Sequence, residues 1–104
     1  NINADSAASA IASQLAAEKL IFLTDQEGVL DNNKEIISSL NFSEIKNLID
    51  SNIISGGMLP KIDACISAIE NNVKRAHIVD GRVQHSVLLE IFTKEGIGTL
   101  VKND

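Results

Sequence analysis

The sequence predicts an α/β fold in which helices pack on a mainly parallel sheet. Two short, continuous apolar runs, at residues 20–25 and 76–80, are typical of strands that are covered on both faces. Between these runs lie a glycine-rich turn and a segment with apolar residues at helical spacing. Strands that alternate with helices in this way indicate a layered α/β domain.

The composition indicates one small globular domain. The chain has 104 residues, of which 44% are apolar and 22% are charged. It has three phenylalanines but no tryptophan or tyrosine, so it lacks the aromatic platforms on which single-stranded nucleic acids stack. The formal net charge of −5 also argues against a general nucleic-acid binder. No apolar run approaches the ~20 residues that a membrane span requires.

Cys65 is the only cysteine, and its apolar neighbours predict a buried thiol rather than a nucleophile. Because no internal disulfide can form and no signal peptide is visible, we expect a reducing compartment, either the cytoplasm or a plastid stroma. The chain begins at Asn1, without an initiator methionine and already within a motif, so we expect a piece of a longer protein.

The first half of the chain predicts a helix, a strand and a long loop. Residues 4–18 are rich in alanine, which favours a helix. The first apolar strand follows at 20–25. Residues 26–41 are loop-like, with turn signals at Gly28 and at 31–33 and room for a small hairpin.

Two helices are expected in the middle of the chain. Asn41 and Ser43 are both good N-caps for a helix that runs to about Ser51. After the glycine-rich loop, Pro60 is expected to open a second helix that ends at 71–72. The apolar positions of this helix have the spacing of one helical face, namely Ile62, Cys65, Ile66, Ile69 and Val73.

The last third predicts two strands around a helix. The strand at 76–80 is closed by Gly81, and residues 85–92 are expected to form a short, very apolar helix. A final strand is expected at 96–101.

The run from Ser55 to Lys61, with the sequence SGGMLPK, has the properties of an anion site. Glycines allow backbone N–H groups to approach a phosphate, and the helix N-terminus supplies unpaired donors and partial positive charge. Lys61 adds a full charge in the first turn. The alternative interpretation is that Lys61 is simply a solvated surface lysine. A lysine is electrostatically unfavourable at the positive end of a helix, however, and a bound anion would offset this repulsion.

Polar residues also follow the two predicted strands. Thr24 and Asp25 end the first strand, and Asp80 and Gly81 end the second. Because ligands of open α/β sheets collect at the carboxyl ends of strands, these residues and Lys61 favour a phosphate-bearing ligand. Asp25 would accept hydrogen bonds from a ribose or would simply be a turn residue at a strand end.

Four other polar residues have both a structural and a functional interpretation. Asp5 is either an N-cap of the alanine-rich helix or a carboxylate that holds lysines in position. Asn1 is a turn residue or an amide that binds substrate. His77 is expected to be a structural strand residue and His85 a cap or surface group. Neither histidine has a partner at metal-ligand spacing, so no metal site in the protein is predicted.

Several motifs together resemble the carboxyl-terminal half of the acetylglutamate kinases, a branch of the amino-acid kinase family. The motifs are the segments 1–5, 23–25 and 56–61, and above all 77–85 (HIVDGRVQH), 88–93 and 96–99. The resemblance covers essentially the whole chain. It implies a three-layer α/β/α sandwich, of which residues 1–104 would be the nucleotide-binding part. It also implies phosphorylation of the side-chain carboxylate of N-acetyl-L-glutamate by ATP, with Mg²⁺ held mainly by the nucleotide, in arginine biosynthesis.

The resemblance also implies roles for particular residues. Asn1 would contact acetylglutamate, Asp5 would organise two catalytic lysines, and Lys61 would be one of these lysines. The nucleotide site would be lined by Asp25, Gln26, Glu27, Gly28, Val29, Leu30, Ile53, Ile54, Ser55, Gly56 and Gly57.

Regulation and assembly are implied as well. Many members of the family are inhibited by arginine, and His77, Glu90 and Gly96 match positions of that effector site. From its sequence context alone, Glu90 is either a carboxylate that pairs with a guanidinium or a residue of a solvated helix face. The full-length protein would be a homo-oligomer, and the PII signalling protein is a partner of some members. No nucleic-acid or membrane partner is expected.

The amino-terminal half of the family holds a Gly-rich loop, a second catalytic lysine and a substrate-binding arginine, none of which is in this sequence. We therefore expect no appreciable kinase activity from the isolated chain. Two rival interpretations are another amino-acid kinase and a non-catalytic module that binds nucleotide or arginine.

Overall fold

The computed structural model describes residues 19–82 and 98–104. Its elements, in chain order, are β1 (Lys19–Thr24), β2 (Ser39–Asn41), α2 (Phe42–Asp50), α3 (Met58–Glu70), β3 (Arg75–Asp80) and β4 (Thr99–Lys102). The helices expected at 4–18 and 85–92 lie outside the described residues.

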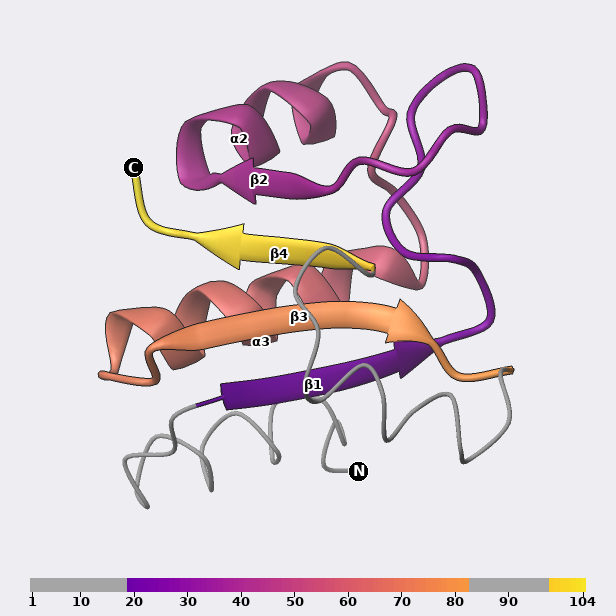
Figure 1. Ribbon diagram of the computed structural model, residues 1–104. Helices are drawn as coiled ribbons and strands as arrows, with labels where there is room; N and C mark the ends of the chain where they lie inside the picture. Colours follow the sequence, from indigo (N-terminus) through magenta and orange to yellow (C-terminus); the bar gives the residue numbers. More distant parts are fainter. Residues whose placement is uncertain (1–18, 83–97) are drawn as a thin grey trace.

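The strands form one mixed sheet in the order β1-β3-β4-β2. β1 and β3 are parallel, with Thr24 opposite Asp80, and β2 and β4 are also parallel. The central pair, β3 and β4, is antiparallel. Figure 1 shows the consequence, because β1 and β3 end at the edge of the sheet where β2 and β4 begin. The mainly parallel sheet was thus predicted correctly, while the antiparallel pairing was not foreseen.

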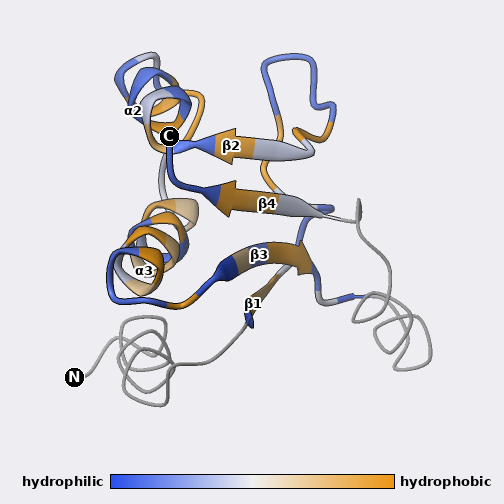
Figure 2. Ribbon diagram, turned by 60° about the vertical axis from the view of Figure 1, so that its left-hand side comes forward, coloured by the Kyte–Doolittle hydropathy of each residue, from blue (hydrophilic) through white to orange (hydrophobic). Residues whose placement is uncertain are grey.

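Both described helices lie on one face of the sheet (Figure 2). α3 packs against β3 and β4 and runs antiparallel to β3, which follows it after a short turn (Figure 1). The N-terminus of α3 therefore lies at the edge where β1 and β3 end. Within the described ranges, no helix is long and apolar enough to cross a membrane.

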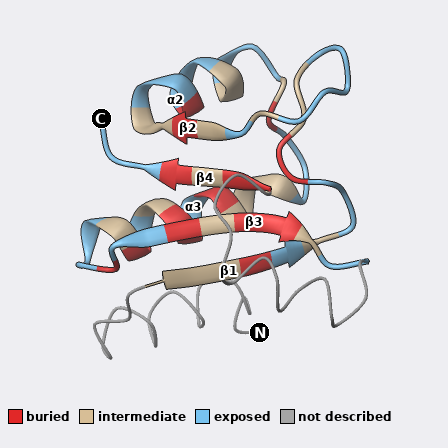
Figure 3. Cartoon of the chain, in the orientation of Figure 1, coloured by how far each residue is buried: buried red, intermediate tan, exposed pale blue. Residues whose placement is uncertain are grey.

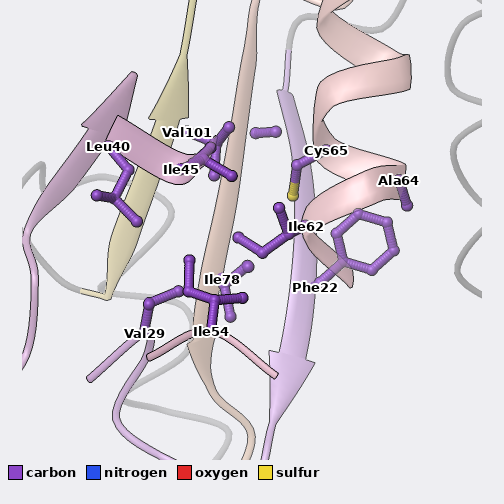
Figure 4. Close-up of a cluster of buried hydrophobic side chains, with 11 residues drawn as sticks. Phe22, Val29, Leu40, Ile45, Ile54, Ile62, Ala64, Cys65, Ile78 and Val101 are labelled. Atoms are coloured by element: carbon purple, nitrogen blue, oxygen red, sulfur yellow. The ribbon is translucent and has the colours of Figure 1, made fainter. Parts of the chain in front are cut away.

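The core fills the space between the sheet and these helices (Figure 3). Ile62 and Cys65 of α3 and Ile78 of β3 are fully buried, which confirms the expected burial of the thiol. Figure 4 shows Val29 and Ile54, two loop residues, packed beside Ile78 at one end of this core. The core thus reaches into the loops at the carboxyl edge of β1 and β3.

Most predicted element boundaries are within one or two residues of the observed ones. The strands expected at 20–25 and 76–80 are β1 and β3, and Asn41 is indeed the N-cap of α2, in a capping box with Glu44. α3, however, begins at Met58 rather than at Pro60. Because the first helical residues need no intrahelical N–H donor, proline is also tolerated at this third position.

Two further differences concern strands. The last strand is Thr99–Lys102, while residues 96 and 97 of the expected strand at 96–101 lie outside the described residues. β2 lies in a segment expected to be a loop. β2 has only three residues and owes its strand conformation to pairing with β4, a contact between distant parts of the chain that no local pattern reports.

The N-terminus of α2 generates a prediction on pH. The Asp104 carboxylate accepts hydrogen bonds from the N–H and hydroxyl groups of Ser43, which lower the pKa of Asp104. A carboxyl whose pKa is lowered by folding stabilises the fold above its unfolded pKa, and this stabilisation is lost as the pH falls through the folded value. Urea titrations should therefore find wild type more stable than Asp104→Asn at pH 7, with the difference shrinking below about pH 4.

In a Ser43→Ala background, the same Asp104→Asn change should have a smaller effect, because one of the two donors is gone. A difference that is equally large at pH 7 and pH 3 would contradict the role of the ionised carboxylate.

Candidate functional site

A cavity of about 800 Å³ opens at the edge where β1 and β3 end. It is lined by the end of β1 with the loop that follows, by the hairpin after this loop, and by the turn between α2 and α3 with the first turn of α3. The lining residues are Thr24, Asp25, Gln26, Val29, Leu30, Asp31, Lys34, Ile53, Ile54, Ser55, Gly57, Met58 and Lys61.

The floor of the cavity is apolar and belongs to the core. Val29 and Ile54 are each only 2% exposed, and both are packed in the main hydrophobic cluster while they line the cavity. Figure 4 shows them side by side. These two residues therefore support the cavity from below, and the apolar surface open to a ligand comes from the partly exposed Leu30, Ile53 and Met58.

The hairpin expected between 26 and 41 exists and forms one wall. Leu30 and Ile36 form an isolated antiparallel bridge. The Asp31 carboxylate accepts hydrogen bonds from the N–H groups of Asn33 and Glu35, at 2.8 and 3.0 Å. These bonds fix the turn, in which Lys34 has a positive φ of 61°. The turn thereby brings a carboxylate and a lysine to the cavity.

The opposite wall begins where α2 ends. Asn52 has a φ of 65°, and the N–H groups of Ile53 and Ile54 donate to the Leu48 carbonyl. This left-handed reversal is a common way for a helix to end. It directs the chain past Ile54 into the glycine-rich turn.

The glycine-rich turn differs in part from its expected form. The helix N-terminus was expected to supply unpaired donors, but the first two N–H groups of α3, those of Met58 and Leu59, donate to the carbonyls of Ser55 and Gly56, at 3.3 and 3.1 Å. Within this turn, the backbone groups left to contact an anion are those of residues 55–57. A Cβ placed on Gly57 would meet no atom within 4 Å, so this glycine borders open space in the cavity.

Lys61 lines the cavity from the first turn of α3, and its side chain is partly buried. Among the lining residues, Lys34 is the second cation, and Asp25 and Asp31 supply carboxylates. Ammonium groups bind phosphate oxygens, and carboxylates bind hydroxyl groups or hard divalent cations. The arrangement suits an anionic ligand with hydroxyl groups or an accompanying metal ion.

Asp80 and Gly81 lie next to the cavity but do not line it. The Gly81 N–H donates to the Thr24 carbonyl, which ties the end of β3 to that of β1. Asp80 accepts three hydrogen bonds from Arg82, from its backbone N–H, Nε and Nη2, each at 2.9 Å. These bonds hold the pKa of the Asp80 carboxyl below its ordinary value. The Asp80 carboxylate therefore stabilises the turn that follows β3.

Nine residues of the predicted site are brought together at the cavity, namely Asp25, Gln26, Val29, Leu30, Ile53, Ile54, Ser55, Gly57 and Lys61. Glu27, Gly28 and Gly56 are close in sequence but are not lining residues. His77 lies inside the sheet, opposite Ile21 and Leu100. Asn1, Asp5, Glu90 and Gly96 lie outside the described residues.

The sequence analysis missed four lining residues. Thr24 was placed at a strand end but not assigned to the site, and Asp31 was interpreted only as a turn residue. Met58 lay within the SGGMLPK run but was given no role of its own, and Lys34 was not considered. The hairpin signal at 31–33 was the clue to Lys34, since a tight turn there returns the lysine toward the loop. Within residues 19–82 and 98–104, no three His, Cys, Asp or Glu side chains are grouped to hold a metal ion.

Comparisons with known proteins point in one direction. Residues 1–80 match the sequence model of the amino acid kinase family. The chain is 60% identical over 102 residues to acetylglutamate kinase of Campylobacter hominis and 57% identical over 103 residues to that of Helicobacter hepaticus. These matches cover 98% and 99% of this chain, but only 36% and 37% of the relatives. The chain thus spans about a third of the length of these curated relatives.

Solved structures share the fold. N-acetylglutamate synthase from Neisseria gonorrhoeae, complexed with coenzyme A and L-arginine, superposes with a TM-score of 0.85 at 30% identity, over 100% of this chain and 24% of that one. Carbamate kinase from Giardia lamblia bound to AMP-PNP superposes with a TM-score of 0.77 at 26% identity, over 99% of this chain and 33% of that one.

Two glycines, Gly57 of the cavity lining and Gly28 behind it, should respond differently to alanine. A Cβ on Gly28 would lie 2.8 Å from Thr99 Oγ1 and 3.3 Å from the Thr99 backbone nitrogen, whereas Gly57 has open space and an ordinary φ of −66°. Gly28→Ala should lower the free energy of unfolding by about 1–3 kcal/mol through overpacking. Gly57→Ala should change it by less than about 1 kcal/mol, and toward greater stability. Equal losses in urea titrations of the two variants would contradict this packing.

Proposed function

Because the chain belongs to the amino acid kinase family, we propose that it is the ATP-binding part of an acetylglutamate kinase. The reaction would be phosphorylation of the side-chain carboxylate of N-acetyl-L-glutamate. One observation carries the proposal: the cavity at the carboxyl ends of β1 and β3 combines Lys61, a glycine-rich turn and an apolar floor. The high identity to acetylglutamate kinases, 60% and 57%, supports this substrate over those of other family members.

The size of the cavity and the chemistry of its lining support the proposal of MgATP as the ligand. Its volume of about 800 Å³ lies within the usual range for small-molecule sites. Leu30, Ile53 and Met58 are partly exposed and offer an apolar surface for an adenine ring. Asp25 offers acceptors for ribose hydroxyls or for a magnesium-bound water. The residues present therefore fit the nucleotide and its metal.

Lys61 is the residue to which we assign the main catalytic role. Bound ATP supplies the phosphoryl group that is transferred, together with Mg²⁺ that neutralises part of its charge. The Lys61 ammonium would lie against the phosphate oxygens and stabilise the negative charge that develops on them. Gly57, which has no side chain, leaves room for the phosphates beside the first turn of α3.

Other roles in this proposal fall on residues outside the described ranges. Asn1 would contact acetylglutamate, and Asp5 would orient the catalytic lysines. Homo-oligomeric assembly, a cytoplasmic or plastid location and PII binding belong to the same proposal for the full-length protein.

A second candidate function is arginine binding. The superposed Neisseria gonorrhoeae synthase was crystallised with L-arginine, and it is 30% identical over the whole of this chain. His77, Glu90 and Gly96 are the proposed effector residues. Saturable binding of L-arginine without binding of MgATP would favour a regulatory module over the nucleotide-binding part.

Lys61→Ala should weaken MgATP binding by about tenfold to a hundredfold, because one charge-assisted contact to the phosphates is lost. Isothermal titration calorimetry of the chain measures this directly. Lys46→Ala is the matched control, since Lys46 is an exposed lysine of α2 that does not line the cavity. Its dissociation constant should stay within about twofold of wild type. Similar losses in both variants would indicate a nonspecific charge effect instead of a site.

Catalysis can be tested in a chimera. We expect no turnover from the 104-residue chain alone, since it spans about a third of the length of the relatives. Replacing the matching segment of the Campylobacter hominis acetylglutamate kinase by this chain should preserve activity with ATP and acetylglutamate. Lys61→Ala in the chimera should then lower kcat by at least about a hundredfold. A folded chimera without activity would contradict the proposed function.

A further inference from the structure

Among the described residues, Thr99, the first residue of β4, is the only polar residue that is fully buried, and it contacts the hairpin of the cavity wall although it lies near the other end of the chain. Its Oγ1 accepts a hydrogen bond from the Val29 N–H at 2.9 Å and donates one to the Ile37 carbonyl at 2.7 Å. The partners are 70 and 62 residues away in sequence. The Thr99 hydroxyl therefore connects β4 to both Val29 and Ile37, the two residues that form the base of the hairpin.

The Thr99 hydroxyl is inserted into the backbone pairing between Val29 and Ile37. The Ile37 N–H donates directly to the Val29 carbonyl at 2.8 Å, as in an antiparallel pair. The reciprocal bond, from the Val29 N–H to the Ile37 carbonyl, runs through the Thr99 hydroxyl instead. Because Val29 is only 2% exposed, water has little access to replace the hydroxyl if it is removed.

Gly28 makes room for this contact. A Cβ at that position would lie 2.8 Å from Thr99 Oγ1 and 3.2 Å from the Ile36 side chain. The hydroxyl can reach the Val29 N–H only because residue 28 has no side chain. Gly28 was assigned to the nucleotide site by resemblance. It does not line the cavity, but its missing side chain lets Thr99 reach the loop that does.

The hairpin that Thr99 holds is a wall of the cavity. Val29 and Leu30 line the cavity at the start of the hairpin, and Asp31 and Lys34 line it at the turn. A displacement of the Val29–Ile37 base would move all four residues together. Neither the hydroxyl nor β4 lines the cavity itself.

We propose that Thr99 is a positioning residue for nucleotide binding: its buried hydroxyl sets the position of the hairpin wall and so the affinity for MgATP. The inference rests on the proposed function, which it deepens. Thr99 acts through Val29 and does not itself touch the ligand.

The test compares four chains in titrations with MgATP. Thr99→Val keeps the shape but removes both hydrogen bonds, and its dissociation constant should rise by about tenfold. Thr99→Ser keeps the hydroxyl and should stay within about threefold of wild type. Val101→Ala is the matched control, since Val101 is a buried β4 residue that does not contact the loop through a hydrogen bond. It should lower stability while it leaves the dissociation constant within about twofold of wild type.

Two further readouts separate positioning from general stability. Hydrogen exchange of the Val29 amide should become at least about tenfold faster in Thr99→Val but not in Val101→Ala, measured where both chains are folded. In the Campylobacter hominis chimera, Thr99→Val should raise KM for ATP and leave kcat and KM for acetylglutamate within about twofold. If Thr99→Val fails to fold, Thr99→Cys replaces it, because a thiol is a weak donor and acceptor.

The outcomes are distinct. If wild type binds MgATP and Thr99→Val, or its substitute, binds equally well, this inference is overturned and the proposed function stands. A loss in Thr99→Ser as large as in Thr99→Val would also overturn it, since the hydroxyl would then not matter. A wild-type chain that binds no MgATP would overturn the proposed function and this inference with it.

Discussion

The direction of α3 relative to the sheet is the constraint on which the site depends. α3 runs antiparallel to β3, and β3 is parallel to β1, so the N-terminus of the helix and the ends of both strands meet at one edge. Lys61 therefore shares a cavity with Asp25, although 36 residues separate them in sequence. Were β1 and β3 antiparallel, the loop after β1 would leave from the opposite edge of the sheet.

The cavity and the core are continuous with each other. Val29 and Ile54 are nearly inaccessible to solvent, yet both line the cavity, so the packing of the domain fixes the floor on which a ligand would rest. The walls are fixed by hydrogen bonds: Asp31 organises the hairpin turn, and the Thr99 hydroxyl ties the hairpin base to β4. A preorganised site of this kind loses little conformational freedom when it binds.

Local patterns in the sequence predicted the structural features that depend on residues close together in the chain. The apolar runs of β1 and β3, the Asn41 cap and the turn at Asp31 depend on neighbouring residues, and each was found. The brief strand β2 and the antiparallel β3–β4 pair depend on partners far along the chain, and they were missed. The same holds for the site: the glycine-rich turn and Lys61 have a local signature, whereas the contact between Thr99 and Val29, 70 residues apart, appears only after folding.

The most direct test of the account is a structure of the chain with Mg²⁺ and the nonhydrolysable nucleotide AMP-PNP. The account predicts that the phosphates lie beside Gly57, with Lys61 Nζ within about 3.2 Å of a phosphate oxygen and the base against Leu30 and Ile53. Nucleotide bound elsewhere on the chain, with Lys61 directed away from its phosphates, would contradict the central claim.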